Sequence, residues 1–277
     1  MLKLSVLFTF LLCISGNVFA AESGKYFDRM ITVIFENTNY ADAIKQPFFK
    51  KLAGDGANFT NFLALTHPSQ GNYIALTSGS LNGVTGDGRY DVNANNIIDL
   101  LEARGISWKV YAEGYPGNCY TGMNSGQYYR KHNPFISYVN VQHDSARCAK
   151  IVDASEFDRD MQSGNLPSYV FYVPDAKNDG HDTGVKYADK WYSGKFGSLF
   201  ADPNFMNRTV IVSTFDESGA SSVNQIYTSV VGPAVKAGSY ADSVNLVSLL
   251  KMAEENWNLG DLGKGDVNAP SLANIFH

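Results

Sequence analysis

The sequence predicts an α/β fold with a mainly parallel central sheet and helices on both of its faces. Strands buried on both faces are apolar along almost their whole length, and the helices between them show an apolar repeat of about 3.6 residues. Five apolar runs fit such strands, at residues 30–35, 108–112, 169–173, 209–215 and 226–231. Six helical patterns alternate with them, at residues 47–53, 70–77, 96–103, 156–162, 188–200 and 244–257. This alternation is typical of an α/β domain.

The first 20 residues predict a secretory signal peptide. Lys3 precedes an apolar run over residues 4–14, and the segment ends with a small residue, Ala20. The run is too short to span a bilayer, and no later stretch approaches the roughly 18 apolar residues that a membrane helix needs. We therefore expect an exported protein, periplasmic or secreted and without a stable membrane anchor, whose mature chain is one domain over residues 21–277.

The charge balance argues against nucleic acid as a partner. The whole chain has a net charge of −5, and loss of Lys3 with the signal peptide would make it −6. Proteins that bind nucleic acid or anionic membrane surfaces carry basic patches, which a mildly acidic chain does not favour.

Two cysteines remain in the mature chain, Cys119 and Cys148. In an exported protein such a pair favours a disulfide, which here would close a loop of roughly 30 residues and contribute about 3 to 4 kcal/mol to the free energy of unfolding. The alternative, a thiol metal site, would need further ligands nearby in the sequence, and the chain does not offer them.

Ser69 stands between a proline and the start of the predicted helix over residues 70–77. Pro68 biases His67 toward an extended conformation, so Ser69 would lie at the N-terminus of the helix. Free N–H groups at that end favour an anion such as phosphate and a developing alkoxide, which makes Ser69 a candidate nucleophile. The alternative is an ordinary N-cap serine, whose hydroxyl accepts a hydrogen bond from a helix amide.

Acidic and amide side chains follow three of the predicted strands. They are Glu36-Asn37, then Asp175 with Asn178-Asp179-Gly180-His181-Asp182, and then Asp216-Glu217. The C-terminal ends of parallel strands lie on one edge of a sheet, so we expect these clusters to converge there. With few Lys or Arg nearby, the acids would repel one another unless they were protonated or bound to a cation, and we expect a divalent metal site. A single cluster of this kind is more often a turn or a helix cap, but three such strand ends together with Ser69 favour the metal site.

Short motifs that include these residues occur in order along nearly the whole mature chain. They are Glu36-Asn37, Thr66-His67-Pro68-Ser69-x-x-Asn72-Tyr73, Tyr111-Ala112-Glu113, Asn118-Cys119-Tyr120, His132-Asn133-Pro134-Phe135, Ala146-Arg147-Cys148, Asn178-Asp179-Gly180-His181-Asp182 and Thr214-Phe215-Asp216-Glu217. Together they resemble the phosphoesterase family that contains bacterial and fungal acid phosphatases and the non-haemolytic phospholipases C, relatives of the alkaline phosphatase superfamily. The resemblance implies an alkaline-phosphatase-like core in one catalytic domain and a phosphate ester as substrate, most simply the monoester of an acid phosphatase.

The resemblance also implies roles for individual residues. The family's metal-binding pairs and its nucleophile segment, which also touches the metal, correspond to Glu36, Asn37, Ser69, Asp216 and Glu217. Its Asp/His pair at the active-site edge corresponds to Asp179 and His181. Two recurring histidines, expected in phosphate contact or proton transfer, correspond to His132 and His67. Many bacterial members carry a further histidine after the Asp-Glu pair, where this chain has residues 224–227 in a form closer to the fungal phosphatases, and this leaves the identity of the general acid open.

Elementary chemistry agrees with these roles. A divalent metal beside Ser69 would lower the pKa of its hydroxyl and neutralise phosphoryl oxygens, so that attack gives a phosphoserine that water then hydrolyses. A histidine would protonate the leaving oxygen, and His181 is the first candidate. The sequence leaves open the identity of the metal, the physiological substrate and the oligomeric state.

Three other functions compete with a phosphomonoesterase. A phosphodiesterase or phospholipase C would use the same site on a diester such as a phospholipid head group, although no added lipid-binding domain is apparent. A binding protein without turnover is disfavoured by the intact Ser69 and by both acidic pairs. A serine esterase of the α/β-hydrolase type is disfavoured because no G-x-S-x-G motif occurs in the chain.

Overall fold

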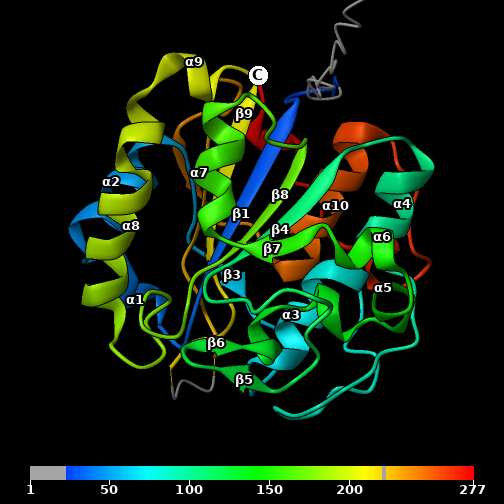
Figure 1. The fold of residues 1–277 in the computed structure, drawn as a ribbon. Helices are drawn as coiled ribbons and strands as arrows, with labels where there is room; N and C mark the ends of the chain where they lie inside the picture. The colour runs from blue at the N-terminus through cyan, green and yellow to red at the C-terminus, as the bar shows by residue number, and fades with distance from the viewer. Residues whose placement is uncertain (1–22, 220–222) are drawn as a thin grey trace, which may run out of the picture.

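The computed structural model describes residues 23–219 and 223–277, so the predicted signal peptide lies outside the described residues. An eight-stranded sheet forms the centre of the molecule, with the strand order β11-β2-β10-β9-β1-β8-β4-β7 (Figure 1). Its strands are β1 (Arg29–Phe35), β2 (Ala57–Phe59), β4 (Trp108–Ala112), β7 (Ile151–Asp153), β8 (Tyr169–Val173), β9 (Thr209–Phe215), β10 (Thr228–Val231) and β11 (Gly238–Tyr240). Two smaller pairs join β3 (Phe62–Leu63) to β12 (Val244–Asn245) and β5 (Asn124–Ser125) to β6 (Tyr128–Tyr129).

Each helical pattern of the sequence corresponds to a helix whose ends lie within three residues of the expected ones. These helices are α2 (Pro47–Asp55), α3 (Gln70–Ser78), α4 (Ile97–Ala103), α7 (Ser155–Gln162), α8 (Val185–Ala201) and α10 (Leu246–Trp257). Shorter segments add α1 (Tyr40–Ala43), α5 (Val139–Gln142), α6 (Ser145–Cys148), α9 (Pro203–Met206), α11 (Gly265–Asn268) and the 3-10 helices η1 (Arg130–His132), η2 (Phe135–Ser137) and η3 (Ala273–Ile275). Within the described ranges, no helix has the length and apolarity needed to cross a membrane.

The sheet is mainly parallel, as predicted, but β10 breaks the pattern. β1 pairs in parallel with β8 and β9, and β4 pairs in parallel with β8 and β7. β10 is the exception within this mainly parallel sheet, because it runs antiparallel to β9 and to β2. A parallel neighbour needs a crossover connection, usually a helix, and the described residues between β9 and β10 contain none.

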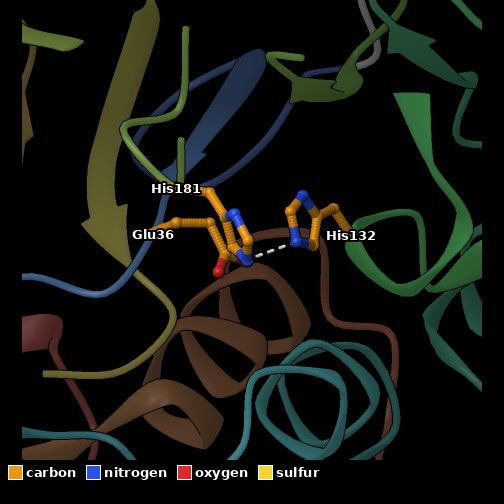
Figure 2. A group of neighbouring side chains, drawn as sticks. All are labelled: Glu36, His132 and His181. Carbon is orange, nitrogen blue, oxygen red and sulfur yellow. Dashed lines mark ion pairs between the residues drawn. The ribbon is translucent and has the colours of Figure 1, made fainter. Parts of the chain in front are cut away.

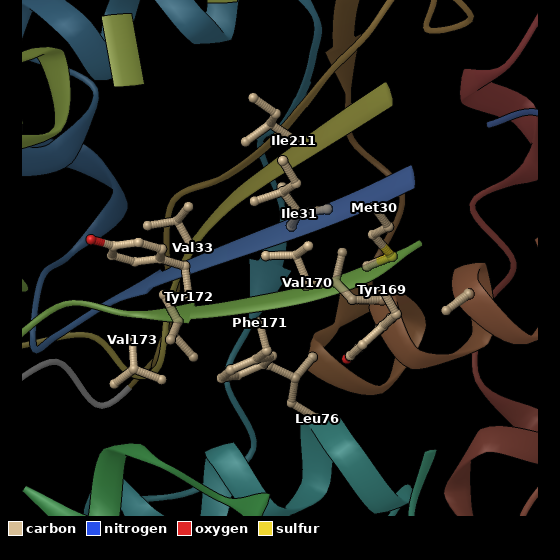
Figure 3. Close-up of a cluster of buried hydrophobic side chains, with 14 of the residues drawn as sticks. Met30, Ile31, Val33, Leu76, Tyr169, Val170, Phe171, Tyr172, Val173 and Ile211 are labelled. Atoms are coloured by element: carbon tan, nitrogen blue, oxygen red, sulfur yellow. The ribbon is translucent and has the colours of Figure 1, made fainter. Parts of the chain in front are cut away.

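Helices cover both faces of the sheet, which confirms the predicted fold class (Figure 1). Successive side chains of a strand point to opposite faces, so β8 contributes side chains to the packing on both faces of the sheet. Tyr172 packs edge-on against Phe196 of α8, with ring centroids 5.1 Å apart, and Phe171 packs against Phe135 of η2 at 5.2 Å. Figure 3 shows Leu76 of α3 on the Phe171 side. The helix headed by Ser69 is therefore fixed to the buried middle of the sheet.

Cys119 and Cys148 form the predicted disulfide, across a sequence separation of 29 residues. We expect the double variant Cys119→Ser/Cys148→Ser to lose about 3 to 4 kcal/mol of unfolding free energy, because the unfolded chain regains the entropy of that loop. Urea unfolding of both proteins measures the difference. Equal midpoints, or two free thiols in non-reducing peptide maps of the native protein, would contradict the prediction.

Candidate active site

Three strand ends bring the predicted acids to one edge of the sheet. Phe35 of β1 is in parallel register with Phe215 of β9, so Glu36 and Asp216 follow on neighbouring strands. The Asn37 amide donates to Asp216 Oδ1 at 3.2 Å, and the Glu36 amide donates to the carbonyl of Asp179 at 3.0 Å. The expected convergence is thus present, since the backbone itself ties the loop after β8 to the ends of β1 and β9.

Ser69 lies against these carboxylates and does not cap its helix. Its backbone is already helical, with φ −41° and ψ −55°, and its side chain forms no capping hydrogen bond. The hydroxyl oxygen is instead 2.9 Å from Glu36 Oε2 and 3.3 Å from Glu217 Oε1, and the residue is only 2 % exposed. A cap needs an extended backbone, so the N-cap interpretation of Ser69 is wrong.

Glu36 is the residue on which the other polar groups of the site converge. Tyr73, one turn into α3, donates its hydroxyl to Glu36 Oε1 at 2.6 Å, and the Asn37 side-chain amide donates to Oε2 at 3.1 Å. His132 Nε2 lies 3.1 Å from Glu36 Oε1, but the angles of this contact do not fit a hydrogen bond. The Tyr73 and His132 rings stack nearly parallel, with centroids 5.5 Å apart.

His132 and His181 bring two further nitrogen atoms to the same point. His132 Nδ1 lies 3.0 Å from Asp179 Oδ2, and the His181 amide donates to Asp179 Oδ1 at 2.8 Å. One ligand atom each from Glu36, His132 and His181 lie within 4.8 Å of one another (Figure 2). Glu36 is common to this group and to the metal ligands that the sequence predicts. The other two members of the group are histidines, whereas the predicted ligands include Asp216 and Glu217.

His67 meets the site from the opposite side. Its Nδ1 lies 2.7 Å from Glu217 Oε2, while its side chain stays 44 % exposed. The segment before it is held by Asn72, whose Oδ1 accepts from the amides of Leu65 and Thr66, and by Asn224, whose Nδ2 donates to the carbonyl of Thr66. Asn224 is the first of residues 224–227, the segment in which many bacterial members carry a histidine, and here its side chain holds the backbone of Thr66 in place.

Burial makes the ionised form of these carboxyl groups unfavourable when no cation is bound. Burial, reinforced by repulsion from Glu36 and Glu217, raises the pKa of Asp216 well above its usual range. Burial also raises the pKa values of Glu36 and Glu217, although their interactions with His132 and His67, respectively, act in the opposite direction. Burial lowers the pKa of His132 to about 4, so this imidazole is neutral near pH 7 and does not compensate the acids.

The donor atoms fit a divalent cation. Asp216 Oδ2 is buried and has no hydrogen-bond partner within the described part of the chain. Carboxylate, amide and hydroxyl oxygens around it are the ligands of hard cations, and the neighbouring imidazoles also suit first-row transition metals. A bound cation would let the carboxyl groups ionise despite their burial.

Three contributors escaped the sequence analysis: Tyr73, Lys131 and Asp87. Tyr73 belongs to one of the family motifs but is given no role there, although its spacing of four from Ser69 places both on one helix face. The sequence places few Lys or Arg near the acids, but the fold adds Lys131 to the site, with its Nζ 3.4 Å from His181 Nε2. Lys131 also contacts Asp87 Oδ2 at 2.7 Å, and Asp87 Oδ1 accepts from the amide of Gln70 at 3.0 Å. These contacts cross long sequence separations, and no local pattern indicates them.

Comparisons with known proteins agree with this geometry. A family model described as the phosphoesterase family matches residues 27–260. A probable acid phosphatase of Kluyveromyces lactis is 35% identical over 93% of this chain and 64% of its own length. An acid phosphatase of Aspergillus fumigatus is 35% identical over 90% of this chain and 59% of its own. A phosphatidylinositol-3-phosphatase of Mycobacterium tuberculosis is 31% identical over 93% of this chain and 85% of its own length.

The fold has counterparts among solved structures. A protein of the alkaline phosphatase superfamily from Vibrio parahaemolyticus superposes with a TM-score of 0.62 and 12% identity, covering 91% of this chain and 72% of that one. The core is therefore alkaline-phosphatase-like. The chain spans about three fifths of the length of the fungal relatives it matches.

Proposed function

This chain belongs to the phosphoesterase family, and from that premise we propose that it is an exported, metal-dependent acid phosphatase that hydrolyses phosphate monoesters through a phosphoserine. The observation that carries the proposal is the position of Ser69 Oγ, buried between Glu36 and Glu217 and free of any helix-capping role. The relatives named acid phosphatase and phosphatidylinositol-3-phosphatase support a monoester as the substrate.

The residues around Ser69 suit a two-step reaction. A divalent cation held by Glu36, Asn37, Ser69, Asp216 and Glu217 would lower the pKa of the serine hydroxyl and neutralise phosphoryl oxygens. The serine oxygen attacks phosphorus while its proton passes to a neighbouring carboxylate, and the bond from phosphorus to the leaving oxygen breaks. Water then cleaves the phosphoserine, and the carboxylate returns the proton to Ser69.

His181 is suited to supply the proton to the leaving oxygen. Its Nδ1 lies 2.8 Å from Asp182 Oδ1, which orients the ring, and its partly exposed Nε2 faces Lys131 at the edge of the site. In the first step His181 gives a proton to the departing alcohol, and in the second it takes one from the attacking water. In this proposal His132, which lies between Glu36 and Asp179, contacts the phosphate, and His67, which contacts Glu217, orients that carboxylate.

A comparison of p-nitrophenyl phosphate with bis(p-nitrophenyl) phosphate tests this function. We expect the purified chain to hydrolyse the monoester at least about tenfold faster, since a diester places a second organic group where the site holds charged side chains. Faster cleavage of the diester would favour the phosphodiesterase or phospholipase C alternative. Cleavage of neither compound at any pH or with any added divalent metal would favour a binding protein.

A further inference from the structure

A small pocket opens beside the catalytic cluster, with a volume of about 290 Å³. Its walls include Asp87, Gly88, Met123, Asn124, Tyr129 and Lys131, and we call it the Tyr129 pocket. Neither the proposed chemistry nor the comparisons assign it a role.

The Tyr129 pocket adjoins the reacting groups directly. The ring of Tyr129 lies 5.7 Å from that of His132 and 6.0 Å from that of His181, measured between centroids. Lys131 forms part of the wall and reaches His181 Nε2 at 3.4 Å. On the other wall, Asp87 binds the amide of Gln70, the residue that follows Ser69. An alcohol leaving from a phosphate on Ser69 with its oxygen near His181 would extend into this space.

The walls are built before any ligand arrives. Tyr129 ends strand β6 of the hairpin with β5, and η1 follows at once with Lys131 and His132. The intervening Arg130 is 1 % exposed and fixed at both ends of its guanidinium, to Asp91 Oδ1 at 2.7 Å and to the carbonyls of Tyr90 and Thr121. The backbone that carries Tyr129 is therefore anchored.

The chemistry of the walls selects a particular kind of alcohol. Tyr129 offers a flat ring and Met123, 55 % exposed, offers a polarisable thioether, and both favour a flat aromatic partner. The charges of Lys131 and Asp87 neutralise each other at 2.7 Å, so the pocket has no excess charge for a second anionic group. Its volume suits one ring system and is too small for the two acyl chains of a phospholipid.

We propose that the Tyr129 pocket is the leaving-group subsite, and that it favours monoesters of aromatic or heteroaromatic alcohols over those of small polyols. This inference rests on the proposed phosphatase function. Met123, whose exposed side chain contributes little to the core, is the specificity-determining residue that can be changed with least risk to folding.

The test compares kcat/KM for 1-naphthyl phosphate and for β-glycerophosphate in the wild type and in Met123→Ala. We expect the variant to lose about two- to tenfold on the naphthyl ester, the range of a lost sulfur–aromatic contact, and less than about twofold on the glycerol ester. The quantity compared is the ratio of kcat/KM for the naphthyl ester to kcat/KM for the glycerol ester. The greater intrinsic reactivity of the aryl ester contributes equally to this ratio in every protein and therefore cancels. Tyr187→Ala is the matched control, because it removes another large, exposed hydrophobic side chain, on α8 away from this pocket. It should leave the ratio of the two kcat/KM values unchanged.

Binding of 1-naphthol by calorimetry provides a readout that does not need turnover. Weaker binding in Met123→Ala than in Tyr187→Ala supports the subsite, whereas equal binding in all proteins, or an equal loss on both esters, overturns it. A wild type that binds 1-naphthol through Met123 but cleaves neither ester contradicts the phosphatase function, and it reduces the pocket from a leaving-group subsite to a site that binds an aromatic ring.

Discussion

Ser69→Ala is expected to lower kcat by about 10³-fold or more while leaving the fold intact, because the variant loses the atom that would attack phosphorus. The serine makes no capping bond, so its stability effect should stay below the about 1 kcal/mol that a lost cap costs. The hydroxyl instead faces Glu36 and Glu217, and removing it leaves the Asn37 amide still bound to Glu36 Oε2. Steady-state kinetics and thermal melts on the same preparation measure both quantities.

Ser78→Ala is the matched control for this experiment. Ser78 is a buried serine at the other end of α3, and its hydroxyl donates to the carbonyl of Ile74 at 2.8 Å. We expect that variant to melt at a lower temperature with turnover nearly unchanged, the reverse of the Ser69 result. Acid quenching of the wild type during turnover should in addition trap phosphate on Ser69. Near-normal kcat in Ser69→Ala with a lowered melting temperature would mean that the serine is structural.

The features that the sequence predicted well are those set by local pattern. Apolar runs place β1, β8 and β9 because strands buried on both faces have few polar residues, and parallel pairing then carries Glu36 and Asp216 to one edge whatever the detailed packing. The helix after Ser69 follows from the proline before it. Strands such as β2 and β11, of three residues each, are too short to show any period, so only tertiary pairing reveals them.

Contacts that depend on tertiary packing could not be predicted from the sequence. A tyrosine at position 73 is typical of a helix that packs on a core, and only the fold turns its hydroxyl onto Glu36. Lys131 lies 95 positions after Glu36 in the chain, and its approach to the site depends on the irregular hairpin and 3-10 turn that precede His132. The direction of β10 likewise depends on the connection after Glu217, since a Ser/Gly-rich loop sequence indicates a turn but does not say whether the next strand runs parallel or antiparallel.

Removal of the divalent metal is expected to lower hydrolysis by about 10²-fold or more, and adding the metal back should restore it. A cation at the carboxylates would contribute several kcal/mol of charge stabilisation in the transition state, and each 1.4 kcal/mol corresponds to about tenfold in rate. The need follows from the site itself, since Asp216 Oδ2 is buried without a hydrogen-bond partner and burial raises the pKa values of Glu36, Asp216 and Glu217 together. Exhaustive chelation with elemental analysis, followed by titration with Mg²⁺, Ca²⁺, Mn²⁺, Fe²⁺ and Zn²⁺, measures the effect and identifies the ion.

The variant Asp216→Asn distinguishes the effect of cation binding from an effect on the stability of the fold. The substitution removes one of several buried, mutually repelling carboxyl groups, so the stripped variant should melt at or above the temperature of the stripped wild type. Added metal should raise the melting temperature of the wild type, because a metal concentration of a hundred times the dissociation constant adds about 2.7 kcal/mol to the free energy of unfolding. It should have little effect on the melting temperature of the variant. Asp189→Asn is the control: Asp189 is also buried but caps α2 through the amides of Phe48 and Phe49, so this variant should melt lower and keep its full response to metal. Full activity of chelated protein that contains no metal, or an equal metal response in Asp216→Asn and the wild type, would refute a cation held by these carboxylates.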